Sequence, residues 1–249
     1  MNIFFHSISM VALLLFGATP LFGEGGEMAT IEDVCREYPD RVKILFEKLD
    51  LEREDLKSVK ESYDKSDFPE ACRRLLKHYK ETRTKPWIEK DPPLFEMSIS
   101  LSVSEVMNHE FRMNDIKAKV PFSKTGGWDW TDKGPRNDRE WAFSLNRHYH
   151  FRLLCQEWMK EKNPEYIRFI DRQVKDWVVT SPYPGKKTNM PQWRGLETAI
   201  RSVHWAYIFY HLQEAPEFTP AARILMLSAI PDHAHYNRNF HAAGGNWTV

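Results

Sequence analysis

The sequence predicts an all-α protein built from antiparallel helix pairs. Apolar residues recur at helical spacing through most of the chain, and several of these runs open with a helix-capping residue or a proline. No stretch shows a convincing alternation of apolar and polar residues, which a half-buried strand would require. The 249 residues are enough for one or two domains with a substantial core.

The N-terminal residues 1–23 predict a secretory signal peptide. They carry no Lys, Arg, Asp or Glu, and an apolar run from Ile8 to Phe16 is followed by small residues that suit a cleavage site. This run is too short to span a bilayer comfortably, and no later stretch resembles a transmembrane helix. We therefore expect a periplasmic or secreted protein with no membrane association after cleavage.

Residues 24–110 are expected to form variable leading helices. Thr30 can cap the first helix, and helical spacing of apolar residues continues from Val34 to Leu49. Shorter helices are expected over 52–62, 68–84 and 98–109. Three prolines mark a connector between the last two, namely Pro86, Pro92 and Pro93.

Residues 111–249 are expected to form the main helical body. A loop is predicted from Met113 to Arg136, since this stretch holds Gly-Gly and Gly-Pro pairs. After it, the apolar spacing and the capping residues predict four helices, over 137–158, 164–181, 191–212 and 221–239.

The composition argues against one class of protein and shows an unusual number of aromatic residues. The 35 basic and 35 acidic residues cancel, which argues against a nucleic-acid binder driven by charge. Nine Trp and 13% aromatic residues are high, and they fit either large buried anchors or stacking platforms for sugar rings.

Three cysteines are present, namely Cys35, Cys72 and Cys155. Cys35 and Cys72 could pair, but three small buried residues are the favoured interpretation because the first two fall on apolar helix faces. No Cys-X-X-Cys pair or Cys/His ligand spacing occurs, so neither a metal nor a cofactor is predicted.

Three segments could carry chemistry. Trp128 and Trp130 flank Asp129 in the loop and could stack on a sugar ring, or they could instead anchor the loop to the core. Asn146 lies inside the predicted helix 137–158, where either a ligand or a buried hydrogen-bond network would explain a mediocre helix former. Arg194 and Arg201 flank Glu197 at helical spacing, so Glu197 could bridge both, or an Arg could bind a carboxylate or sulfate.

These segments together resemble the N-terminal helical domain of the heparinase II/III-like polysaccharide lyases, the heparin-sulfate and alginate lyase group. The resemblance runs from Trp128 to Trp247 and rests on the order and spacing of short motifs. They are Trp128-Asp129-Trp130, Glu140-Trp141, Leu145-Asn146-Arg147-His148, Tyr166, Trp177, Trp193, Leu196-Glu197, Ala199-Ile200-Arg201, Trp205, His233-Ala234 and Gly245-Asn246-Trp247.

The resemblance implies an (α/α) toroid followed by an antiparallel β-sandwich, and β-elimination of uronic-acid-containing polysaccharides. In that reaction the uronate carboxylate must be neutralised before a base can remove the neighbouring proton. Asn246 matches the neutralising Asn of the family and is the catalytic candidate. The candidate substrate-binding residues are Trp128, Trp130, Asn146, Trp193, Arg194, Arg201 and Trp247.

The resemblance also implies that relatives supply a catalytic Tyr and a β domain beyond this Asn. We therefore expect an incomplete toroid, truncated at its C-terminus, whose missing parts are the remaining helices and the β-sandwich. The resulting hypothesis is the N-terminal part of an exported lyase acting on heparan sulfate- or alginate-like glycans. The alternatives are a non-catalytic helical module that binds acidic glycans and, more weakly, a toroidal glycoside hydrolase.

Overall fold

Helices carry nearly all of the regular structure in the computed structural model, which describes residues 28–82 and 101–240. The leading part comprises α1 (Ile31–Glu37), α2 (Pro39–Lys48), the 3-10 turn η1 (Glu54–Leu56), α3 (Lys57–Asp64) and α4 (Phe68–Glu81). The predicted signal peptide and the connector prolines Pro86, Pro92 and Pro93 lie outside the described residues.

The second part contains the longest helices. It comprises α6 (Val103–Met107), β1 (Glu110–Met113), β2 (Ile116–Lys119), α7 (Arg139–Leu145), α8 (Tyr149–Glu161), α9 (Pro164–Thr180), η2 (Pro191–Trp193), α10 (Gly195–His211) and α11 (Pro220–Phe240). No helix of residues 28–82 and 101–240 is both long and apolar enough to cross a membrane.

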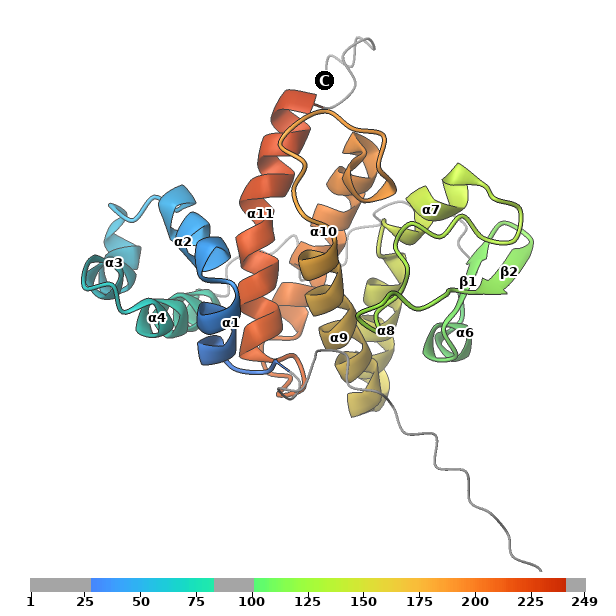
Figure 1. Cartoon of the computed structure of the whole chain (residues 1–249). Helices are drawn as coiled ribbons and strands as arrows, with labels where there is room; N and C mark the ends of the chain where they lie inside the picture. Colours follow the sequence, from blue (N-terminus) through green and yellow to red (C-terminus); the bar gives the residue numbers. More distant parts are fainter. Residues whose placement is uncertain (1–27, 83–100, 241–249) are drawn as a thin grey trace, which may run out of the picture.

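Helix α11 lies at the centre of the molecule (Figure 1). It packs against α1, α2 and α4 on one side and against α9 and α10 on the other, while α8 packs against α9 and α10. Helices that follow one another in the chain also pack together, as in α3 with α4, α8 with α9, and α10 with α11. The prediction of an all-α fold made of helix pairs is therefore confirmed, and closure of the pairs into a toroid stays a prediction.

Capping residues begin the helices where the sequence predicts them. The Thr30 hydroxyl oxygen accepts a hydrogen bond from the Asp33 amide, and the Asp33 carboxylate accepts one from the Thr30 amide, which forms a complete capping box. Asn163 caps α9, whose first residue is Pro164. The apolar spacing from Val34 to Leu49 is interrupted at Pro39, because a proline disfavours helical geometry in the residue before it.

The long helix predicted over 137–158 is wrong, because the chain breaks it into α7 and α8. The Asn146 side chain ends α7 by donating to the Ala142 carbonyl oxygen at 2.9 Å, and His148 adopts the left-handed conformation with φ 59°. Spacing of apolar residues could not reveal this break, since in the sequence that spacing continues across it.

The prediction that the chain has no strands is also wrong, although only one short hairpin contradicts it in the described residues. β1 and β2 form an antiparallel hairpin in which Glu110 pairs with Lys119 and Met113 pairs with Ile116. Asn114 begins the turn with φ 52°, a conformation that asparagine tolerates. Phe111 and Met113 face the core, but a strand of four residues is too short to show a clear alternation in the sequence.

Helix α9 holds the two parts of the molecule together through buried charges. Asp171 and Lys175, one turn apart, form an ion pair of 2.6 Å with almost no exposed surface. Lys175 also donates to the Met28 carbonyl oxygen at 2.7 Å, and Asp171 accepts from the amide and hydroxyl of Thr219, each at 2.7 Å. The pair therefore ties the start of the described chain and the residue before α11 to the same helix.

Candidate functional site

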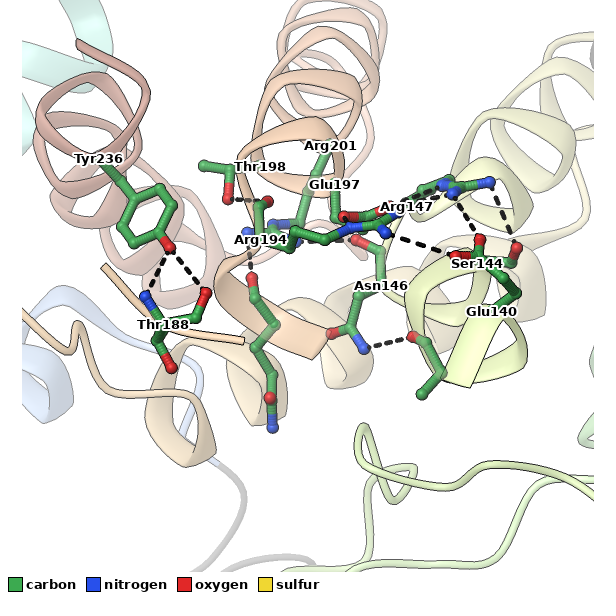
Figure 2. A network of polar contacts seen from close by, with 12 residues as sticks. Glu140, Ser144, Asn146, Arg147, Thr188, Arg194, Glu197, Thr198, Arg201 and Tyr236 are labelled. Carbon is green, nitrogen blue, oxygen red and sulfur yellow. Dashed lines mark hydrogen bonds and ion pairs between the residues drawn. The ribbon is translucent and has the colours of Figure 1, made fainter. Parts of the chain in front are cut away.

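Glu197 is the centre of a buried ion-pair cluster at the start of α10. Its carboxylate has no exposed surface, and Oε1 accepts from Arg147 Nη2 at 2.9 Å and Nε at 3.1 Å. Arg194 binds the same carboxylate through Nε and through Nη2, the latter 2.6 Å from Oε1. At the surface, Glu140 Oε2 lies 3.6 Å from Arg147 Nη2, and Glu140 Oε1 lies 3.4 Å from Arg194 Nη1. Figure 2 shows these four side chains together.

Arg201, which the sequence predicts as the second partner of Glu197, donates its hydrogen bonds elsewhere. Its three guanidinium nitrogens donate to His233 Nε2 at 2.9 Å and to the carbonyl oxygens of Asn146 and Gln192, each at 2.8 Å. The guanidinium carbon also lies 4.0 Å from the centroid of the Trp177 ring. Arg201 is fully buried, so its partners are groups of the protein.

Asn146 belongs to the same buried network. Its Nδ2 donates to the Trp130 carbonyl oxygen at 2.7 Å as well as to Ala142, and its Oδ1 accepts from Trp177 Nε1 at 2.9 Å. The buried hydrogen-bond network, one of the two explanations weighed for this residue, is the role that these contacts support. Asn146 thereby joins α7, α9 and the loop between β2 and α7 that carries Trp128 and Trp130, here called the aromatic loop.

The aromatic loop is fastened to the core by both of its tryptophans. Trp128 is 0% exposed and Trp130 is 3% exposed. Their indole N–H groups donate to His109 Nδ1 at 3.0 Å and to Asp176 Oδ2 at 2.7 Å. The loop also approaches Asp176 closely at Gly127, where an added Cβ would lie 1.9 Å from the carboxyl carbon. The second interpretation weighed for the pair, a loop anchored by its aromatic rings, is the one this geometry supports.

Four buried histidines line the centre of this aromatic core, namely His148, His150, His204 and His233. Burial lowers the pKa of His150 to about 3 and that of His204 to about 4, and it holds the pKa of the other two well below the ordinary value. His148 Nδ1 accepts from Trp205 Nε1 at 2.9 Å, and His233 Nε2 accepts from Arg201. These nitrogens can accept only while the rings are neutral.

A hollow of about 720 Å³ lies next to the ion-pair cluster. The segment 187–189, the first turn of α10 and the last turns of α11 form its walls, and Arg194 lies at its edge. The Tyr236 hydroxyl holds two walls together, since it accepts from the Thr188 amide at 3.0 Å and donates to the Thr188 carbonyl oxygen at 3.2 Å (Figure 2). The described residues that line it are Lys187, Thr188, Asn189, Arg194, Gly195, Leu196, Ala199, Tyr236, Asn237 and Phe240.

The lining of this hollow has a chemistry that suits an anionic sugar. It contains two cations, two amide side chains and no carboxylate among the described residues. The start of α10 adds the positive end of a 17-residue helix, and Leu196 and Phe240 add apolar surface. Cations and amides bind carboxylate or sulfate groups, while apolar side chains cover the faces of sugar rings.

The structure separates the predicted site residues into three groups. Arg194 lines the hollow, whereas Trp128, Trp130, Asn146, Trp193 and Arg201 are buried in the network beneath it. Asn246 and Trp247 lie outside the described residues. Sequence reasoning missed Lys187, Asn189 and Tyr236 as lining residues. Only the Lys-Lys pair in the proline- and glycine-containing turn, Lys186-Lys187, gave a signal for them.

Within residues 28–82 and 101–240, no three His, Cys, Asp or Glu side chains gather in a way that could hold a metal ion. The histidines of the core lie instead against aromatic rings, with the His148 and Trp130 centroids 5.0 Å apart.

Comparison with known proteins assigns the chain to a family. A family model described as Heparinase II/III N-terminus matches residues 45–249. The chain belongs to this family. The family resemblance predicted from the short motifs is thus confirmed, and the matched range contains the hollow, the ion-pair cluster and Asn246.

Relatives of the family share both sequence and fold with the chain. A heparin-sulfate lyase of Bacteroides thetaiotaomicron is 23% identical over 216 residues, which cover 81% of this chain and 30% of that protein. The crystal structure of heparan sulfate lyase HepC from Pedobacter heparinus superposes with a TM-score of 0.66 at 20% identity, covering 82% of this chain and 33% of that one. A crystal structure of heparinase III gives a TM-score of 0.65 at 20% identity, covering 81% and 32%. The chain therefore spans about a third of the length of these relatives.

Proposed function

We propose that the chain is the N-terminal part of an exported polysaccharide lyase that acts on uronic-acid-containing glycans. Membership of the heparinase II/III family over residues 45–249 is the observation that carries this proposal. Heparan sulfate is the first candidate substrate because the relatives are named as heparin-sulfate and heparan sulfate lyases, and alginate-like glycans are the second. The uncharged leader 1–23 supports a periplasmic or secreted location.

The hollow beside Arg194 is the proposed binding surface for the acidic glycan. Lys187 is exposed, and Arg194 keeps part of its guanidinium at the surface while Glu197 holds the rest. Glu197 thus fixes the direction of the Arg194 fork without occupying all five of its N–H groups. A carboxylate or sulfate that enters the hollow can meet both cations and the first amides of α10.

Chemically, β-elimination requires that charge from the departing C5 proton spread into the uronate carboxylate. A neutral amide donor suits this task because it stabilises the developing charge without titrating. We propose Asn246 as that donor, and its place six residues after Phe240 puts it close in the chain to the hollow's edge. The base and the acid are expected in the part of the relatives' length that this chain does not span.

Binding should depend on the cations of the hollow. Replacing Lys187 by Ala is expected to weaken binding of a heparan sulfate oligosaccharide about tenfold, since a charge-assisted contact is worth roughly 1.4 kcal/mol. Isothermal titration at two salt concentrations measures this, and the wild-type affinity should fall as salt rises. Lys186→Ala is the matched control, because Lys186 is exposed in the same turn but does not line the hollow. Equal affinity for a neutral oligosaccharide of the same length would contradict an acidic-glycan surface.

Elimination should require more chain than binding does. Residues 24–249 are expected to give no rise in ultraviolet absorbance from an unsaturated product, whereas a chain extended to the length of the relatives should be active. In the extended chain, Asn246→Ala should lower kcat by roughly 10²- to 10³-fold, as for removal of an oxyanion donor. Activity of residues 24–249 alone would disprove the expectation that the base and the acid lie in the part of the relatives' length that these residues do not span. An extended chain that binds glycan but never cleaves it would favour the non-catalytic binding module.

A further inference from the structure

Two cysteines on different helices lie with their thiols in contact. Cys35 is on α1 and Cys72 is on α4, and these helices pack against each other. The two side chains interact closely enough that Cys72 lowers the pKa of the Cys35 thiol and Cys35 raises that of Cys72. Glu32 and Arg73 form an ion pair between the same two helices. Arg73 directly follows Cys72, and Glu32 lies one helical turn before Cys35.

We propose that Cys35 and Cys72 form a disulfide bond that links α1 to α4. The two thiols differ in a way that suits its formation in steps. Cys35 is partly exposed, whereas Cys72 has no exposed surface. An exposed thiol can attack an external disulfide, and a buried neighbour can then displace the group that was attached.

The chemistry balances with a small disulfide such as oxidised glutathione as the oxidant. The Cys35 thiolate attacks one sulfur of oxidised glutathione, which forms a mixed disulfide and releases one glutathione thiolate. The Cys72 thiol then loses its proton and attacks the Cys35 sulfur, which releases the second glutathione thiolate. Cys35 is the attacking thiol because it is the exposed member of the pair, and the neighbouring Cys72 side chain lowers its pKa.

The bond would close a loop that contains α2, η1 and α3. Of the helices that it joins directly or encloses, α1, α2 and α4 pack against α11, the central helix. A cross-link of this kind stabilises mainly by restricting the unfolded chain. The third cysteine, Cys155, is buried on α8 and serves as an internal reference, because burial raises the pKa of its thiol to about 12.

Counting free thiols tests the proposal directly. The full chain is incubated with oxidised glutathione, then denatured, alkylated and weighed by mass spectrometry. One alkyl group, on Cys155, is the expected result, against three after complete reduction. The joined peptides should contain Cys35 and Cys72. Three alkyl groups after oxidation, a glutathione group retained on Cys35, or a bond that includes Cys155 would each overturn the proposal.

Thermal unfolding gives the second readout. Reduction of the oxidised chain should lower Tm by on the order of 5 to 10 °C. Cys35→Ser should abolish this dependence on reductant and Cys155→Ser should retain it. Since Cys35 is only partly buried, the first variant tests the bond even if Cys72→Ser fails to fold. A Tm that is the same for oxidised and reduced wild-type protein would overturn the stabilising role.

Discussion

Lowering the pH from 7 to 5 is expected to remove about 4 kcal/mol of stability through His150 and His204 alone. Their pKa values are about 3 and about 4 in the folded protein, against about 6.5 in an unfolded chain. Below pH 6.5 these histidines therefore bind protons in the unfolded state but stay neutral in the folded state. Each histidine costs about 2 kcal/mol at pH 5 relative to pH 7. His148 and His233, whose pKa values are also lowered by burial, add to this loss.

The sign of this dependence is set by the depressed folded-state pKa values. The stabilisation is present above pH 6.5 and is lost as the pH falls toward the folded pKa values. Asp176 and Asp232 work in the opposite direction, because burial raises the pKa of each carboxyl. These two carboxyls are outnumbered by the four buried histidines whose pKa values are lowered. A domain stable by only about 5 to 15 kcal/mol should therefore lose much of that stability between pH 6.5 and 5.

Urea unfolding at pH 7, 6 and 5 measures the effect, and His150→Phe identifies its source. Both ring nitrogens of His150 are buried without a hydrogen-bond partner among the described residues, so phenylalanine removes a titrating group without removing a hydrogen bond. The variant should match or exceed the wild type at pH 7 and lose stability less steeply below pH 6.5. A free energy of unfolding that does not change between pH 7 and 5 would contradict the prediction.

Local signals in the sequence predicted the starts of α1 and α9 correctly. The side chains of Thr30 and Asn163 accept hydrogen bonds from backbone N–H groups that have no partner in the first turn. Pro164 suits the first position of α9 because it has no N–H group to leave unpaired. The break between α7 and α8 escaped prediction because the Asn146 side chain donates both to Ala142 in α7 and to the carbonyl oxygen of Trp130 in the aromatic loop. Such a contact between distant segments leaves no periodic trace in the sequence.

The candidate site was predicted in its region but only partly in its residues. Residue type and spacing indicated that Arg201 and the tryptophans of the loop matter, but they could not distinguish a side chain facing substrate from one satisfied internally. Arg201 is the sharpest case, because its partners include a histidine of α11 and a carbonyl of the α7–α8 junction. Among the sequence-predicted site residues that lie in the described part of the chain, Arg194 alone combines a partner in the core with a place in the lining of the hollow.

Replacing Glu197 by Ala is expected to cost about 3 to 5 kcal/mol of stability, the range for removing one partner of a buried ion pair. Glu197 is 0% exposed and binds two guanidinium groups, of which Arg147 is itself 6% exposed. Without the carboxylate, Arg147 would remain buried with Ser144 as its protein acceptor and with Glu140 at 3.6 Å. Desolvation of an unpaired charge is the physical cause of the loss.

Glu140→Ala is the matched control for this experiment. Glu140 faces the same two guanidinium groups from the surface, with 56% of its side chain exposed, so its loss should cost less than about 1 kcal/mol. Urea unfolding compares the two variants, and an equal loss of unfolding free energy in both would contradict a larger contribution from the buried carboxylate. Binding is then measured without urea, at a temperature where Glu197→Ala is still folded. The affinity of the variant for a heparan sulfate oligosaccharide should also fall, because Arg194 loses the partner that directs its guanidinium along the hollow. A variant destabilised as expected but binding with wild-type affinity would separate the ion-pair cluster from glycan recognition.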